Sequence, residues 1–171
     1  GGVRSYRGSI SAVNGTAGEN RTVNEVPVEQ YLRSVVAAEV SASWANLGGG
    51  RGIEAIKAQA VAARSYALTQ NRYSFARTCD TQACQVYNGA ARRPGIGLAL
   101  TKYEYPEIDF AVGATPGLVR QTGSGSIANT MFSSSSGGWT APSTSPGFPV
   151  VQDLGDDTAS NPHHRWTVNV N

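Results

Sequence analysis

The sequence predicts an α+β domain, because two segments with helical periodicity lie between short strand-like segments and long loops. Residues 6–24 alternate loosely between apolar and polar and are interrupted by Asn14-Gly15, a pair typical of hairpin turns. Residues 27–40 and 53–71 carry apolar side chains at the three- and four-residue steps of a helix face. A further strand is predicted at 130–140, and much of the remaining chain has the composition of loops. We therefore expect two central helices packed against short antiparallel strands, with long loops that wall a binding cleft.

Length and composition favour a single globular domain. The chain has 171 residues, enough for one domain over residues 1–171 or for one domain with two lobes. No stretch reaches the roughly 18 apolar residues of a membrane-spanning helix, and we expect any export signal to have been removed or to lie outside this sequence. The 14 Lys and Arg residues nearly balance 12 Asp and Glu residues, and the basic runs are as short as Arg92-Arg93, which disfavours nucleic acid as a partner.

Glu39 departs from the apolar pattern of the first predicted helix, which Pro27 opens. It follows Val28 by eleven residues, about three helical turns, and so points in nearly the same direction as the apolar stripe. A carboxylate in such surroundings is desolvated, its pKa rises, and at neutral pH it can hold a proton for donation. A buried structural glutamate paired with an arginine would give the same pattern, and the residues alone leave both interpretations open.

Lys57 and Arg64 lie seven residues apart, two turns along one face of the second predicted helix. They could form a cationic wall for an anionic or hydroxyl-rich ligand. They could also be ordinary solvated charges or partners for Glu54 and Glu39, and spacing alone favours this second interpretation.

The loops contain further polar candidates. Residues 133–138 combine four serines with two glycines, which suits sugar or anion contacts but is also common in ordinary loops. His163-His164 could bind a metal, although such pairs are more often solvated. Cys79 and Cys84 could form a short-loop disulfide, half of a metal site or two free thiols, and Cys79 has no adjacent base for a nucleophilic role. There is no serine-hydrolase elbow.

Several segments, in order along the chain, resemble the motifs of the stage II sporulation protein D / amidase-enhancer family. The similarity extends from residue 6 to about 155, nearly the whole chain. The matching segments are Val26–Leu32 with Val35–Glu39, Glu54–Ala67, Cys84–Gly89, Ala111-Val112 with Thr115–Gly117, and Phe132–Thr140.

This resemblance implies an activity on peptidoglycan. The family includes lytic transglycosylases, which cut between N-acetylmuramic acid and N-acetylglucosamine and leave a 1,6-anhydro end, and also proteins described as enhancers of cell-wall amidases. The family's catalytic glutamate falls on Glu39. Substrate contacts are implied for a set of side chains and loop residues: Lys57, Gln59, Arg64, Tyr66, Gln85, Tyr87, Ser135, Gly137, Gly138, Thr140 and Asp153. Of the aromatic residues, Tyr66, Tyr87 and Trp139 are candidates for stacking on sugar rings.

The sequence also departs from the family pattern. Some members bind zinc beside the third motif, but here Ala83 precedes Cys84 and residues 1–162 contain no histidine. A disulfide between Cys79 and Cys84 is therefore favoured, no metal or other cofactor is expected, and an extracytoplasmic location follows. The residues after Glu39 lack the common Met-Pro, which changes the expected loop shape.

The expected partners are peptidoglycan glycan strands and a cell-wall amidase, without nucleic acid. The alternatives to a transglycosylase are a non-catalytic glycan-binding module that stimulates an amidase and a surface adhesion or scaffold domain.

Overall fold

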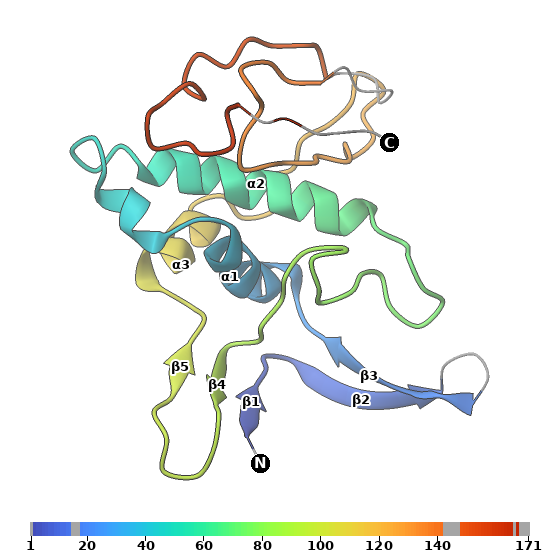
Figure 1. Cartoon of the computed structure of the whole chain (residues 1–171). Coiled ribbons are helices and arrows are strands. Elements are labelled where there is room, and N and C mark those ends of the chain that lie inside the picture. Colours follow the sequence, from blue (N-terminus) through green and yellow to red (C-terminus); the bar gives the residue numbers. More distant parts are fainter. Residues whose placement is uncertain (1, 15–17, 142–147, 166, 168–171) are drawn as a thin grey trace.

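The computed structural model describes residues 2–14, 18–141, 148–165 and 167 (Figure 1). The α+β class predicted from the sequence is confirmed. The elements in chain order are β1 (Val3–Ser5), β2 (Ser9–Asn14), β3 (Asn20–Glu25), α1 (Val28–Glu39), the 3₁₀ helix η2 (Ala42–Asn46), α2 (Ile53–Thr69), β4 (Ala91–Arg93), β5 (Thr101–Lys102) and α3 (Pro106–Gly113).

Helix α1 begins and ends close to the predicted positions. Pro27 lies just before its first residue, and the Pro27 carbonyl accepts hydrogen bonds from the N–H groups of Gln30 and Tyr31 at 3.0 Å. The helix ends at Glu39 because Val40 adopts an extended conformation, with φ −132° and ψ 145°. Val40 and Ser41 stand where the family pattern has Met-Pro, and the chain continues from them into η2.

Helix α2 is the centre of the molecule (Figure 1). Helices α1 and α3 pack on one side of it, and the chain after α3 covers the other side. Small side chains on α2 permit this packing on both sides, as its alanine-rich stripe predicts. Most of the core comes from the three helices: Leu32, Val35, Val36, Ile56, Ala60, Ala63, Ile108, Ala111 and Val112.

Hydroxyl groups attach the C-terminal chain to α2. The Ser65 hydroxyl accepts a bond from Arg120 N–H at 2.8 Å, and the Thr130 hydroxyl donates to the Ala62 carbonyl at 2.7 Å. The strand predicted at 130–140 is wrong: within it, only Trp139 forms an isolated bridge, with Gln152. Thr130 is bonded to a helix carbonyl rather than to a neighbouring strand, so this segment has no ladder to join.

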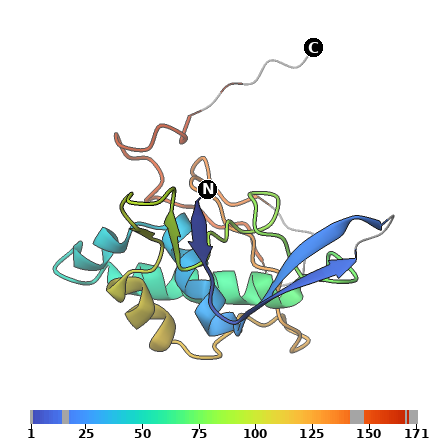
Figure 2. The ribbon, with the colours of Figure 1, turned by 90° about the horizontal axis from the view of Figure 1, so that it is seen from below.

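The strands form two small antiparallel sheets beyond α1 and α3. One has the order β1-β4-β5, and the other is the β2–β3 hairpin. The hairpin pairs Asn14 with Asn20, which confirms the predicted hairpin, although Gly15 of its turn lies outside the described residues. Figure 2 shows that this hairpin projects away from the helices. Among the described residues, no helix has the length and apolarity needed to cross a membrane.

Candidate active site around Glu39

Glu39 is the last residue of α1 and continues its most buried face. Leu32, Val35 and Val36 are fully buried, and Glu39 stands one helical step beyond them, at i+7 from Leu32. Glu39 itself is exposed to solvent. Glu39 thus occupies the position at the end of the helix that the sequence predicts, but it is exposed rather than enclosed by the apolar stripe.

The electrostatic surroundings of Glu39 favour its protonated form. Partial burial desolvates the carboxylate and raises its pKa above the usual glutamate value. The C-terminal end of a helix carries partial negative charge, which disfavours a carboxylate further. Among the described residues, no Lys, Arg or His nitrogen lies within 4.0 Å of Glu39 to offset these effects. Glu39 is thus neither buried nor ion-paired, unlike the structural glutamate considered as its alternative.

Two tyrosines of the helices bear on the predicted site, Tyr31 on α1 and Tyr66 on α2. Burial raises the pKa of Tyr31, and the Glu39 carboxylate adds a smaller effect in the same direction. Tyr66 is half-buried, and its ring meets Phe132 edge-on at a centroid distance of 6.5 Å. A contact of Tyr66 with a ligand stays a prediction.

Lys57 lies on the flank of α2 that faces α3. Its ammonium donates to Glu54 Oε1 at 2.7 Å and lies 5.8 Å from the centre of the Phe110 ring. The side chain is 25% exposed and forms no ion pair with Glu39. This is the ordinary pairing with Glu54 that the spacing favours, and a role in ligand binding stays a prediction.

Arg64 is completely buried, which corrects its assignment as a wall of the ligand site. Its guanidinium bonds both oxygens of Glu29, at 2.9 and 2.7 Å, and also donates to the Leu118 carbonyl at 2.9 Å. Glu29 Oε1 accepts a further bond from Gly117 N–H at 3.1 Å. Burial opposes ionisation of Glu29, but the bonds from Arg64 and Gly117 outweigh it and lower its pKa. Arg64 therefore joins α1, α2 and the chain after α3, and it has no donor facing solvent.

Gln85 and Tyr87 are also buried, so their side chains do not line an open surface. The Gln85 amide donates to the Ala63 carbonyl at 3.3 Å and accepts from the Tyr31 hydroxyl at 3.2 Å. The Tyr87 hydroxyl donates to Asn24 Oδ1 at 2.9 Å, and burial raises the pKa of Tyr87 to about 12. These bonds attach the third motif to both helices and to the β2–β3 hairpin, which is a structural role.

The serine- and glycine-rich loop, residues 133–138, is held in place by hydrogen bonds to Asp156. Sequence analysis does not single out this residue. The Asp156 carboxylate is buried and accepts bonds from the Ser135 hydroxyl at 2.8 Å, Ser136 N–H at 3.0 Å and Gly138 N–H at 3.1 Å. The bond with His164 Nδ1, at 2.7 Å, is the main cause that lowers the pKa of Asp156. Ser135 and Gly138 thus point inward, toward a buried anion of the protein.

His164 is consequently a partner of this loop and is not placed as a general base for serine. Its Nε2 lies 3.4 Å from Asp157, and Asn161 donates to Asp156 Oδ1 at 3.0 Å. Because the carboxylate lies between serine and histidine, this group has the wrong connectivity for a serine nucleophile. Among the described residues, there is no cluster of three or more His, Cys, Asp or Glu side chains suited to a metal.

The other predicted contacts of this loop are exposed. Trp139 is 55% exposed, and Gly137 is open to solvent next to it. Asp153 accepts a bond from the Ser136 hydroxyl at 3.0 Å, and Thr140 N–H donates to the Val151 carbonyl at 2.9 Å. These residues belong to the chain after α3, which covers one side of α2 and which we call the C-terminal layer (Figure 1).

Gln59 has a polar atom in need of a partner. Its Nε2 is buried and finds no acceptor among the described residues.

Two shallow hollows lie on the surface of the described part of the chain. One of about 550 Å³ is lined by Gly8, Ser9, Glu25, Val26 and Pro27, and another of about 470 Å³ by residues from the range 68–77. Neither includes Glu39 or Gln59, so the cleft expected at Glu39 stays a prediction.

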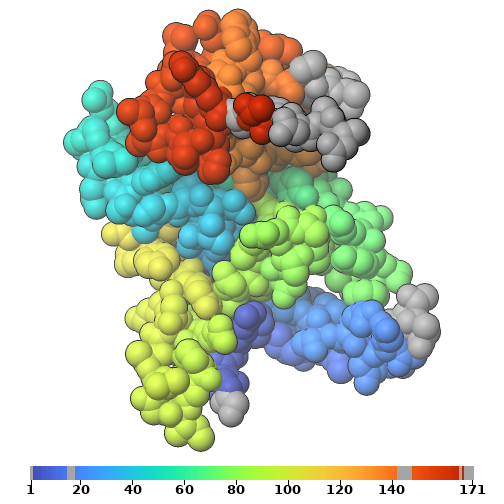
Figure 3. All heavy atoms as spheres, in the orientation of Figure 1, coloured from blue at the N-terminus to red at the C-terminus, as the bar shows by residue number. Residues whose placement is uncertain are grey.

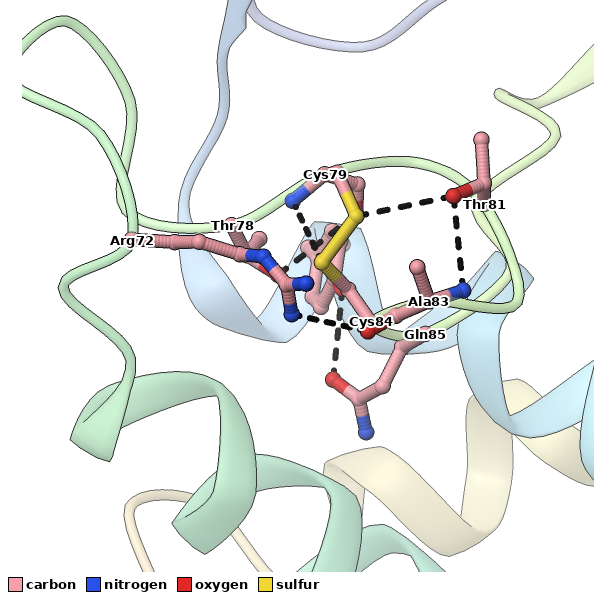
Figure 4. The surroundings of a disulfide bond; sticks show 8 residues. Arg72, Thr78, Cys79, Thr81, Ala83, Cys84 and Gln85 are labelled. Carbon is pink, nitrogen blue, oxygen red and sulfur yellow. Dashed lines mark hydrogen bonds between the residues drawn. A yellow bond between two sulfur atoms is a disulfide. The ribbon is translucent and has the colours of Figure 1, made fainter.

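The disulfide between Cys79 and Cys84 is confirmed (Figure 4). The two Cα atoms lie 5.6 Å apart, and Arg72 donates to the Ala83 carbonyl at 2.8 Å beside them. Gln85 follows Cys84 directly, so the disulfide closes the loop that places Gln85 against the helices. Neither cysteine remains as a thiol for metal binding or nucleophilic attack.

Comparison with known proteins identifies relatives of this chain. The family described as Stage II sporulation protein matches residues 16–121. An amidase enhancer of Bacillus subtilis is 31% identical over 140 residues, which cover 80% of this chain and 16% of that protein. An uncharacterized protein of Brachyspira hyodysenteriae is 40% identical over 72 residues, covering 39% of this chain and 17% of that protein. The chain thus spans about a sixth of the length of these relatives. No solved structure matches it significantly.

Proposed function

Since the chain belongs to the stage II sporulation protein family, we propose that it is an extracytoplasmic domain that binds peptidoglycan glycan strands and cleaves them as a lytic transglycosylase. The observation that carries this proposal is the position of Glu39: a partly desolvated carboxylate at the end of α1, just beyond fully buried side chains and without an ion-pair partner among the described residues. The disulfide fits an oxidising compartment outside the cytoplasm.

The proposed chemistry needs one carboxyl group. Protonated Glu39 donates its proton to the oxygen that joins N-acetylmuramic acid to N-acetylglucosamine, and the bond from that oxygen to C1 of the muramic acid breaks. The Glu39 carboxylate then takes the proton of the C6 hydroxyl as the C6 oxygen attacks C1. The products are a 1,6-anhydro end and a free 4-hydroxyl, and Glu39 is again protonated. A glycosidase that uses water usually needs a second carboxylate, which this reaction replaces with the sugar's own hydroxyl.

Some of the predicted contacts suit this proposal better than others. Tyr66, Trp139 and Gly137 are at least partly accessible, so these residues are our candidates for contacts with the glycan. The Gln59 side-chain nitrogen is buried, so a contact of Gln59 would need its amide to turn outward. Lys57 and Asp153 are exposed enough to contribute. Arg64, Gln85, Tyr87 and Ser135 support the fold beneath the site.

The second candidate function is a non-catalytic module that holds glycan strands and stimulates a cell-wall amidase. The printed name of the Bacillus subtilis relative favours it. Digestion of purified peptidoglycan, with and without prior amidase treatment, separates the two functions. Release of 1,6-anhydromuramic ends, detected by mass spectrometry, supports cleavage. Co-sedimentation with glycan strands in the absence of such ends would support the binding module and make Glu39 a ligand contact.

A further inference from the structure

The loop between β4 and β5 exposes aliphatic side chains at the far end of the molecule from the serine- and glycine-rich loop (Figures 1 and 3). Ile96 is 98% exposed, Leu98 57% and Leu100 47%. We call these three residues the apolar tip. A turn closed by Leu98 N–H on the Gly95 carbonyl at 3.2 Å presents them to solvent, and Gly97 at φ 77° permits the tight reversal.

Four cations lie in the sheet that carries the apolar tip. Arg4 of β1 is paired directly with Arg92 of β4, so the two arginines share one face, while Arg93 and Lys102 occupy positions of the opposite face. All four residues are exposed, and none forms an ion pair with another described residue. Arg4 and Arg92 are like charges directly opposed on neighbouring strands and repel each other, so their face of the sheet favours an external anion, and Arg93 and Lys102 add positive charge to the other face.

The apolar tip lies beyond four cations of the same sheet. A lipid surface has the matching order, with acyl chains beneath charged phosphates. Aliphatic side chains enter the boundary between headgroups and acyl chains, and arginine and lysine side chains remain at the level of the lipid phosphates. A stable protein interface buries about 800 Å² on each partner and is anchored by aromatic side chains, whereas the apolar tip has three aliphatic residues and no aromatic one. A soluble polyanion would engage the cations and leave the apolar tip without a role.

We propose that the β4–β5 hairpin docks this domain on the surface of an anionic phospholipid bilayer, with the apolar tip inserted and the four cations against the headgroups. In this orientation α1 and α3 lie between the membrane and α2, so the serine- and glycine-rich loop faces away from the bilayer (Figure 1). The inference does not depend on the proposed cleavage reaction, because it rests on the hairpin alone.

Sedimentation with lipid vesicles tests this docking. We expect the wild-type protein to bind vesicles of equal parts phosphatidylglycerol and phosphatidylcholine more tightly than vesicles of phosphatidylcholine alone, with weaker binding at higher salt. Arg93→Gln should weaken binding to the anionic vesicles about fivefold. The double variant Ile96→Ser/Leu98→Ser should weaken it by at least about tenfold.

Matched controls remove similar groups elsewhere. Leu154→Ser takes an 80% exposed leucine from the C-terminal layer, and Arg120→Gln/Arg165→Gln removes two exposed charges outside the hairpin. Both controls should bind anionic vesicles within about twofold of the wild-type protein. Ile96→Ser alone preserves the test if the double variant does not fold, as judged by circular dichroism.

Three results would overturn the proposal. One is no binding of the wild-type protein to anionic vesicles. Another is that Arg93→Gln loses binding while the tip variants bind as tightly as the wild-type protein, which would indicate attraction to polyanions in general. The last is a tip variant that fails to stimulate an amidase while vesicle binding stays unchanged, which would assign the hairpin to a protein partner.

Discussion

Removing the carboxylate of Glu29 should destabilise the protein more than removing the charge of its partner Arg64. Arg64 is fully buried, so the variant Glu29→Ala leaves a guanidinium in the core without its carboxylate partner. Breaking a buried ion pair in this way costs about 3–5 kcal/mol. The Glu29 side chain is 37% exposed, which places the expected loss near the lower end, at about 3 kcal/mol.

The reverse change has a milder consequence. Arg64→Met removes the buried charge and leaves Glu29 in reach of water and of Gly117 N–H. The loss is then mainly that of hydrogen bonds, including the one to Leu118, and should be about 1–2 kcal/mol. The double variant Glu29→Ala/Arg64→Met should consequently be more stable than Glu29→Ala alone.

Urea unfolding at pH 7, followed by far-ultraviolet circular dichroism, measures these free energies. Glu54→Ala is the matched control, because it breaks the exposed pair with Lys57 and should change stability by no more than about 0.5 kcal/mol. A Glu29→Ala variant within about 0.5 kcal/mol of the wild-type protein, or a double variant less stable than both single ones, would refute the reasoning.

Three further predictions concern the disulfide, the loop and Glu39. Replacing Cys79 and Cys84 with serine should lower the urea-derived free energy of unfolding by about 2 kcal/mol, the entropy of a short closed loop; an unchanged value would contradict this. Asp156→Asn should lower the free energy of unfolding at pH 7. Because the pKa of Asp156 is lowered in the folded state, this loss should shrink as pH falls below the ordinary aspartate pKa. A difference in unfolding midpoint that does not change with pH would argue against this prediction. The raised pKa of Glu39 means that stability is lost as pH rises above the unfolded glutamate value. Glu39→Gln should therefore raise the free energy of unfolding by about 0.3–1 kcal/mol at pH 7 and leave it unchanged at pH 4.

The parts of the fold that the sequence predicts are those encoded locally. The stripe of α1, the alanine-rich face of α2 and the β2–β3 hairpin all follow from short-range spacing. Helix α3 is not predicted, because its eight residues are too few to show a periodicity distinct from an apolar run.

The buried polar network could not be predicted in the same way. Glu29 and Arg64 are 35 residues apart, and they meet because α1 packs on α2, which spacing along one helix does not reveal. Spacing alone favours an ordinary or ion-paired Arg64, but it cannot identify Glu29 as the partner, and the substrate contact implied by the family resemblance is not supported by its burial. Asp156 and Ser135 are 21 residues apart, and neither lies in a predicted helix, so no periodic signal in the sequence marks their contact.

The most direct test of the central claim is a digestion of glycan strands in water enriched in oxygen-18, comparing the wild-type protein with Glu39→Gln. Glu107→Gln, on the surface of α3, is the control for loss of a carboxylate elsewhere. If Glu39 transfers the proton and the C6 hydroxyl attacks, the wild-type and control proteins form ends that are one water lighter than hydrolysis products and carry no oxygen-18. Glu39→Gln should then form them at least about a hundredfold more slowly. Ends that contain oxygen-18, or full activity of Glu39→Gln, would contradict the proposed role of Glu39.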